Sequence, residues 1–190
     1  MRSWLKWGIP LAIVVLLGAA GGGVLLSQYV YRDTALAQRA DVTPEPGGGG
    51  RSPWGIVYTA GAAAHPDLAA VQALLDNHFR SINEKNYDLW KSTVVRSKWL
   101  ELPKDKWTTS YDTARDFELT VHRIDPGPDG ALLVMLTFRS NQAIEDAPAQ
   151  AKSTCVTWNV VYPLVLDETG QGLRLDTSKL PNSALFKPCE

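Results

Sequence analysis

The sequence predicts an α+β fold, in which helices come first along the chain and pack on an antiparallel sheet formed by the second half. Two observations support this class. Apolar residues recur at helical spacing from Leu68 to Ile82, and after Arg115 their period changes to two. Helices followed by strands that are joined by turns are typical of an α+β domain.

The N-terminal segment predicts a helix that spans a membrane. Between Lys6 and Arg32 the chain carries no charged residue, and roughly 20 apolar residues suffice to cross the core of a bilayer. We therefore assign residues 1–7 to a short cytoplasmic tail and residues 8–31 to a single transmembrane helix. A cleaved signal peptide is the alternative, because residues 35–37 (ALA) match the small-residue cleavage pattern.

Residues 32–55 predict a flexible linker before a folded domain of residues 56–190. The stretch reads RDTALAQRADVTPEPGGGGRSPWG. Its proline, glycine and charged residues cannot form an apolar core, so the segment is expected to connect rather than to fold.

The helical half of the domain is predicted to contain three pieces. The first helix starts near Asp67, and one face of it collects apolar residues: Leu68, Val71, Leu74, Leu75, Phe79 and Ile82. Polar residues 83–86 end this helix, and a shorter one begins at Tyr87. A third short helical or irregular piece is expected over residues 104–115.

The second half predicts strands separated by turns. Phe117, Leu119 and Val121 alternate with polar residues, as in a half-buried strand. The sequence DPGPDG predicts a turn, and residues 132–138 are apolar on both faces, as expected of a central strand. Further strands are predicted over residues 154–164 and 173–176.

The two cysteines predict a disulfide bond that places the domain outside the cytoplasm. A bridge between Cys155 and Cys189 would close a loop of about 33 residues and contribute about 3–4 kcal/mol in the chain-entropy model. It would also hold the C-terminal tail against a strand. Structural disulfides persist in oxidising compartments and are rare in the cytosol. Two unrelated buried thiols are the alternative.

Charge and histidine spacing argue against two classes of function. From Trp54 onward the chain has 14 Lys and Arg residues against 17 Asp and Glu residues, so we expect no nucleic-acid binding. The histidines, His65, His78 and His122, show no metal-ligand spacing with the cysteines. No metal and no cofactor are therefore expected.

One segment resembles a known superfamily. The sequence DLAAVQALLDNHFRSINEKNYDLW, a long helix broken by a polar turn before a Tyr-Asp-x-Trp helix, is similar to the opening of nuclear transport factor 2-like domains. The resemblance covers roughly residues 65–180 and implies a cone of helices inside a curved antiparallel sheet. Bacterial envelope members with one membrane helix include Mce-associated proteins and components of secretion and conjugation machines.

The resemblance leaves function open, because the superfamily contains both enzymes and binding modules. The chain has no nucleophile elbow, HExxH motif or phosphate-binding glycine loop. We therefore expect no catalytic residues and no enzyme, but a membrane-tethered extracytoplasmic binding or scaffold module of the bacterial cell envelope. Its partners would be the membrane and an unknown envelope protein or complex, and the sheet also offers a surface for self-association.

The alternative is a protein that binds a small apolar ligand, or an isomerase- or dehydratase-like enzyme, with its site inside the cone. Polar side chains in the cone could then act as general acid and base, among them Asp112 and Tyr162. The predicted pocket residues are Trp99, Tyr111, Asp116, His122 and Trp158. A scaffold could instead fill the cone with Trp and Leu side chains.

Basic residues alternate with tryptophans between Trp90 and Trp107, in the sequence WKSTVVRSKWLELPKDKW. Such a pattern suits contact with lipid headgroups or an anionic envelope polymer. The residues assigned to this contact are Lys91, Arg96, Lys98, Lys104 and Lys106. In the simpler interpretation the tryptophans fill the core and the lysines solvate the edge of a helix.

Overall fold

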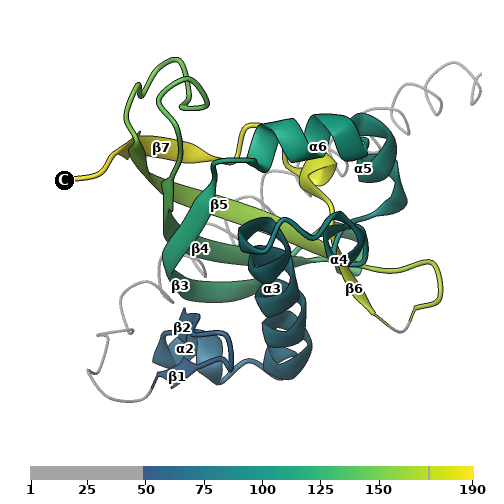
Figure 1. Ribbon diagram of the computed structural model, residues 1–190. Coiled ribbons are helices and arrows are strands. Elements are labelled where there is room, and N and C mark those ends of the chain that lie inside the picture. Colours follow the sequence, from purple (N-terminus) through teal and green to yellow (C-terminus); the bar gives the residue numbers. More distant parts are fainter. Residues whose placement is uncertain (1–48, 171) are drawn as a thin grey trace, which may run out of the picture. The chain divides into compact units, whose positions relative to one another are not determined.

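The computed structural model describes residues 49–170 and 172–190, which form an α+β domain with a seven-stranded sheet (Figure 1). The strands are β1 (Gly50–Arg51), β2 (Val57–Tyr58), β3 (Arg115–Pro126), β4 (Leu132–Asn141), β5 (Cys155–Leu166), β6 (Leu173–Leu175) and β7 (Leu185–Pro188). The sheet order is β1-β2-β3-β4-β5-β6, and β7 pairs with β5. The long strands β3, β4 and β5 therefore form the centre of the sheet.

The helices come mostly from the first half of the described chain. They are α2 (Ala60–Ala63), α3 (Leu68–Asn83), α4 (Tyr87–Lys91), α5 (Arg96–Glu101) and α6 (Lys104–Tyr111), with two short 3-10 helices, η1 (Pro128–Gly130) and η2 (Thr177–Lys179). Figure 1 shows α3 lying against one face of the sheet, with α4 next to it and with α5 and α6 farther up in the view, beyond α4. The predicted order of helices before long strands is confirmed.

The predicted fold class is wrong in two respects. The sheet is mixed, because β2 pairs with β3 in parallel while the other strand pairs are antiparallel. A transmembrane helix is not found either: no helix of residues 49–170 or 172–190 is long and apolar enough to cross a membrane. Residues 8–31, for which that helix was predicted, lie outside the described residues, as does most of the predicted linker.

The end of the predicted linker contributes to the fold. Gly50 and Arg51 pair with β2, and the backbone N–H of Ile56 donates to the Ser52 hydroxyl at 3.1 Å. That hydroxyl also hydrogen-bonds to the carboxylate of Asp76 on α3. The contact joins the start of the domain to its longest helix.

The predicted apolar face of α3 forms part of the hydrophobic core. Val71, Leu75 and Phe79 are fully buried there. Asn83 ends the helix, and the side chain of Asn86 caps α4 by accepting a hydrogen bond from the backbone N–H of Leu89 at 3.0 Å. The polar sequence between the two helices therefore works as predicted.

An irregularity in β3 changes which side chains face the core. The register with β4 shifts between Phe117 and Thr120, and Glu118 has a positive φ of 52°. As a result Asp116 and Leu119 are both buried, whereas Phe117 is paired with Arg139 on the opposite face. The simple alternation predicted for Phe117 is therefore wrong, because an extra residue in a bulge interrupts it.

The predicted disulfide is confirmed. Cys155 and Cys189 are bonded, with their Cα atoms 5.4 Å apart. The backbone N–H of Cys189 also donates to the carbonyl of Cys155 at 3.0 Å, and β7 runs antiparallel to β5 next to the bridge. The C-terminal tail is thus folded back on the sheet.

Candidate functional site

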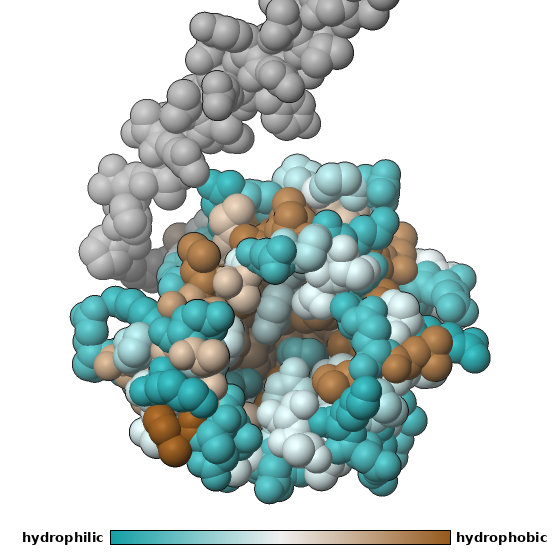
Figure 2. Space-filling view, turned by 90° about the horizontal axis from the view of Figure 1, so that it is seen from above, coloured by the Kyte–Doolittle hydropathy of each residue, from teal (hydrophilic) through white to brown (hydrophobic). Residues whose placement is uncertain are grey.

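A cavity of about 340 Å³ lies between the helices and the inner face of the sheet. Its lining comes from α3, α6, β3, β4, β5 and the segment that joins β4 to β5. The end of the domain that carries this connecting segment faces the viewer in Figure 2, which shows a hollow bordered by apolar and hydrophilic surface. We call this space the first cavity.

Asp116 is the charged group buried in the wall of the first cavity. It is 7% exposed, and its partner across the strands, Ser140, is 5% exposed. The Ser140 hydroxyl donates a hydrogen bond to the Asp116 carboxylate. Tyr111 and Tyr162 line the same cavity. Together with Ser140 they place three hydroxyl-bearing side chains around Asp116.

The backbone of Asp116 is fixed by Asn83, the last residue of α3. The Asn83 side-chain amide donates to the Asp116 carbonyl at 2.8 Å, and its oxygen accepts from the Asp116 N–H at 2.7 Å. These two hydrogen bonds satisfy backbone groups of Asp116, in addition to its pairing with Ser140 on β4. Asp116 therefore has a defined position despite the irregular register.

Burial sets the protonation of the groups around the first cavity. It raises the pKa of Asp116 to about 6, although the Ser140 hydrogen bond and the charge of Lys85 both act to lower it. It raises the pKa of Tyr111 to about 12, with a further contribution from the negative charge of Asp116. Burial also raises the pKa of Tyr162. At neutral pH the phenols are therefore neutral and Asp116 is ionised.

His78 lies on α3 beside these groups and is neutral at pH 7. Burial lowers its pKa to about 4. Its Nδ1 atom lies 2.9 Å from the hydroxyl of Thr93, and its ring meets the ring of Tyr162 edge-on with the centroids 6.0 Å apart. His78 is thus a positioned, uncharged part of the wall.

Aromatic side chains form the apolar side of the first cavity. Phe138 on β4 and Trp158 on β5 face each other across the strands and are stacked, with ring centroids 6.2 Å apart. Ile82 and Val160 complete this apolar surface. A cavity of a few hundred Å³ with an apolar wall and a few convergent polar groups is typical of a small-molecule site.

The segment that joins β4 to β5 closes one edge of the first cavity. Gln142, Asp146 and Pro148 from this segment line the cavity. The Thr113 hydroxyl donates to the Asp146 carboxylate at 2.5 Å and accepts from the backbone N–H of Ala143 at 3.0 Å. These bonds hold the segment against the chain that follows α6.

A second cavity of about 330 Å³ lies next to the first. Its lining includes Trp90 on α4, Leu102 after α5, Leu175 on β6 and Thr177 on η2. The two cavities share three residues, His78, Tyr111 and Tyr162. These three side chains form the partition between the cavities.

The structure brings three of the five predicted pocket residues to the first cavity: Tyr111, Asp116 and Trp158. His122 instead is exposed on β3, where its Nε2 atom lies 2.9 Å from the hydroxyl of Thr137. Burial of part of the ring lowers the pKa of His122. Its strand position directs it away from the core, since the adjacent Val121 is fully buried.

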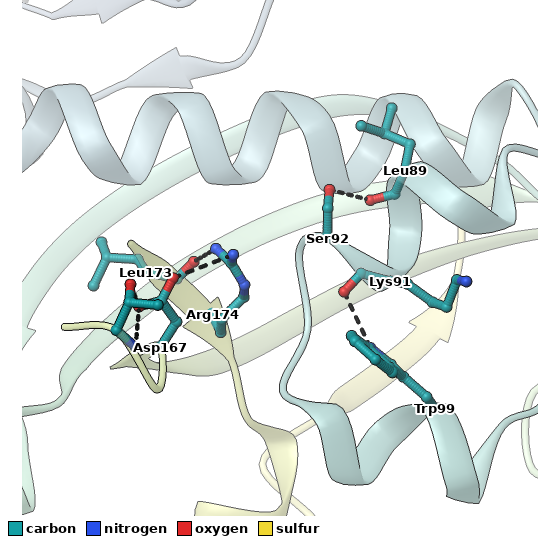
Figure 3. Close-up of polar contacts among 8 residues, drawn as sticks. Leu89, Lys91, Ser92, Trp99, Asp167, Leu173 and Arg174 are labelled. Atoms are coloured by element: carbon teal, nitrogen blue, oxygen red, sulfur yellow. Dashed lines mark hydrogen bonds and ion pairs between the residues drawn. The ribbon is translucent and has the colours of Figure 1, made fainter. Parts of the chain in front are cut away.

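Trp99 also lies outside the first cavity. Its indole N–H donates to the Lys91 carbonyl at 3.1 Å, as Figure 3 shows. It lines a surface groove of about 480 Å³ together with Leu166 and Arg174. In Figure 3 the guanidinium of Arg174 reaches the Leu173 carbonyl and the Asp167 carboxylate, so the far side of this groove is held by polar contacts.

The predicted basic surface is divided between ion pairs and exposed residues. Lys91 pairs with Asp88 at 2.9 Å, and Lys98 pairs with Glu101 at 2.6 Å. The remaining three residues, Arg96, Lys104 and Lys106, are exposed. The tryptophans between them behave differently, since Trp90 is 4% and Trp107 is 1% exposed. These two tryptophans therefore fill the core.

Sequence reasoning missed several residues of the first cavity, above all Ser140 and Phe138. Both lie on β4 and alternate with outward residues of that strand. The alternation of polar and apolar residues after Leu136 could have placed them on one face. Their proximity to Asp116 depends on strand pairing, which one strand alone does not reveal.

The described residues contain no group of three or more His, Cys, Asp or Glu side chains that could hold a metal ion. A comparison with protein-family models, with curated proteins and with solved structures finds no match to this chain.

Proposed function

We propose that this domain is an extracytoplasmic binding module that holds a small, largely apolar molecule bearing one amine group in the first cavity. The observation that carries the proposal is the buried carboxylate of Asp116 beside an aromatic wall. Binding of a small apolar ligand was one alternative to a filled scaffold, and the open cavity supports it. The Cys155–Cys189 bridge supports an oxidising compartment.

The amine group of the ligand is inferred from the negative charge of the Asp116 carboxylate. An ionised carboxylate that is withdrawn from water is stabilised by an opposite charge and by hydrogen-bond donors. Lys85 supplies a nearby positive charge but no hydrogen bond to this carboxylate, because its ammonium group donates to the carbonyls of Tyr111 and Ala114. A ligand amine could donate directly to the Asp116 carboxylate, whereas a ligand carboxylate would be repelled by it.

The apolar part of the ligand is inferred from the aromatic and aliphatic wall of the first cavity. Phe138, Trp158 and Val160 present aromatic and aliphatic surface to the cavity. Burial of apolar area against such a wall contributes about 25 cal/mol per Å². The ligand is therefore expected to carry an alkyl or aromatic group next to its amine.

The test compares n-hexylamine with hexanoate, which have chains of equal length and opposite head-group charge. Calorimetry with the full chain at pH 7.5 should show binding of hexylamine and not of hexanoate. Asp116→Asn should weaken hexylamine binding roughly tenfold to a hundredfold, since a hydrogen bond to a charged group contributes about 1.5–3 kcal/mol.

The matched control is Asp129→Asn. This substitution makes the same charge change in the exposed turn after β3, where the backbone has a φ of 56° that asparagine tolerates. Hexylamine affinity should remain at the wild-type value. Equal binding of hexanoate, or an unchanged affinity in Asp116→Asn, would refute the proposed site.

A further inference from the structure

The second cavity differs in chemistry from the first. Trp90, Val94, Leu102 and Leu175 give it an apolar wall. Its two charged residues, Lys98 and Glu101, are paired with each other at 2.6 Å. The first cavity, in contrast, contains the buried Asp116–Ser140 pair.

The same three residues line both cavities, so their side chains separate the two spaces. His78 is held by Thr93, and Tyr162 lies within the paired part of β5. Tyr111 is the last residue of α6, and its ring packs on Trp107 with the centroids 5.4 Å apart. Because Tyr111 stands at the end of a helix, we expect its side chain to be the one whose rotation joins the two spaces.

We propose that the two cavities are the two halves of one site, which holds an unbranched alkylamine-type amphiphile with its amine at Asp116 and its chain end among Trp90, Val94 and Leu175. This inference rests on the proposed function and extends it, because it specifies the shape of the ligand. A single methylene chain has the smallest cross-section of any extended apolar group, so it requires the least displacement of Tyr111.

The experiment measures the dissociation constants of n-hexylamine, n-octylamine and n-decylamine for the full chain. Each added methylene that is buried should lower the dissociation constant about fourfold. Leu102→Trp would fill the second cavity from its half-buried edge. In this variant decylamine should bind no more tightly than hexylamine, while hexylamine keeps its wild-type affinity.

Two further proteins make the result independent of one substitution. Leu100→Trp introduces the same side chain on α5 at a position that is 85% exposed. In this variant the affinity should still increase from hexylamine to decylamine as in the wild type. Thr177→Trp narrows the second cavity from η2 and should act like Leu102→Trp. Nuclear Overhauser contacts from the terminal methyl of decylamine to Val94 and Leu175 would locate the chain end directly.

The outcomes separate the inference from the proposed function. If hexylamine binds but longer chains bind no tighter, or if the gain survives in both Leu102→Trp and Thr177→Trp, the extended site is refuted and the proposed function stands. If no amine of any length binds, both are refuted. Contacts of the decylamine methyl with Gln142 or Pro148, at the edge of the first cavity, would also refute the extended site.

Discussion

Trp158 on β5 and Phe186 on β7 lie directly opposite each other, with ring centroids 5.1 Å apart. Trp158 is also stacked on Phe138, which lines the first cavity. Phe186 belongs to the strand that the Cys155–Cys189 bridge holds in place. One aromatic contact therefore connects the disulfide to the wall of the candidate site.

Loss of the disulfide should destabilise the domain. In the double variant Cys155→Ser, Cys189→Ser, the bridge that closes a sequence separation of 34 residues is absent. The free energy of unfolding should fall by about 3–4 kcal/mol in the chain-entropy model. Urea titration followed by tryptophan fluorescence measures this change. A reductant should lower the stability of the wild type and leave that of the double variant unaltered, and equal stability of all samples would contradict the prediction.

Truncation of Phe186 should affect ligand binding more than its position on an edge strand suggests. Phe186→Ala removes the ring that packs on Trp158, so the aromatic wall loses its support and hexylamine affinity should fall several-fold. Leu185→Ala is the control, because Leu185 is 70% exposed on the same strand. Calorimetry on both variants measures the difference, and equal affinities would show that β7 does not support the cavity.

The stability of the domain should depend on pH through Asp116. Its pKa in the folded domain is about 6, above the ordinary value of 3.8. The folded state therefore binds this proton more tightly than the unfolded state. Protonated Asp116 stabilises the fold to its full extent below about pH 4, and this stabilisation is lost as pH rises through about 6. A shift of this size corresponds to about 2–3 kcal/mol.

The measurement must separate Asp116 from His78, which has the opposite effect. Burial lowers the pKa of His78 from 6.5 to about 4, so its contribution to stability is lost as pH falls between these values. Asp116→Asn retains His78. The free energy of unfolding of the wild type, relative to that of Asp116→Asn, should therefore increase by about 2–3 kcal/mol from pH 7.5 to pH 4; a constant difference would contradict the prediction.

Local sequence patterns predicted the parts of the fold that depend on neighbouring residues. The stripe from Val71 to Ile82 follows from helical spacing, and the turn after β3 follows from its proline and glycine residues. The disulfide was predictable because the chain has only two cysteines. Each of these features depends on residues within one segment or, for the disulfide, on the pairing of the two cysteines.

The features that escaped prediction depend on contacts between distant segments. Alternation placed Phe117 inward, but the bulge at Glu118 brings Asp116 into the core instead. The parallel pairing of β2 with β3 comes from a strand of only two residues, which carries no periodic signal. The sequence thus predicted Asp116, Tyr111 and Trp158 as residues of the site. It did not predict Ser140, because the proximity of Ser140 to Asp116 depends on the register of β3 and β4.

Asn83 should be required for the position of Asp116. Asn83→Ala removes both hydrogen bonds to the Asp116 backbone, and a lost hydrogen bond that leaves a buried group unsatisfied costs about 1–3 kcal/mol. The variant should be less stable in urea titration and bind hexylamine more weakly. Asn77→Ala, which removes one hydrogen bond from Arg80 on the same helix, should change ligand affinity little. A similar loss of affinity in both variants would contradict this role.

Hexylamine binding should itself depend on pH, with a sign set by Asp116. The amine stays protonated from pH 5 to pH 8, since alkylammonium groups such as that of lysine have a pKa of about 10. Below the Asp116 pKa of about 6, a proton competes with the amine for the carboxylate, so affinity should fall about tenfold in total between pH 7 and pH 5. Above pH 7 the affinity should be constant.

The other groups that face Asp116 do not produce this profile. Tyr111 and Tyr162 stay neutral because their pKa values are raised, and His78 titrates only near pH 4. The pKa of Lys85 is lowered by burial but raised by Asp116, and its ammonium group remains bound to backbone carbonyls. Calorimetry from pH 5 to pH 8 should therefore give a flat profile for Asp116→Asn, and a wild-type affinity that did not change with pH would place the amine away from Asp116.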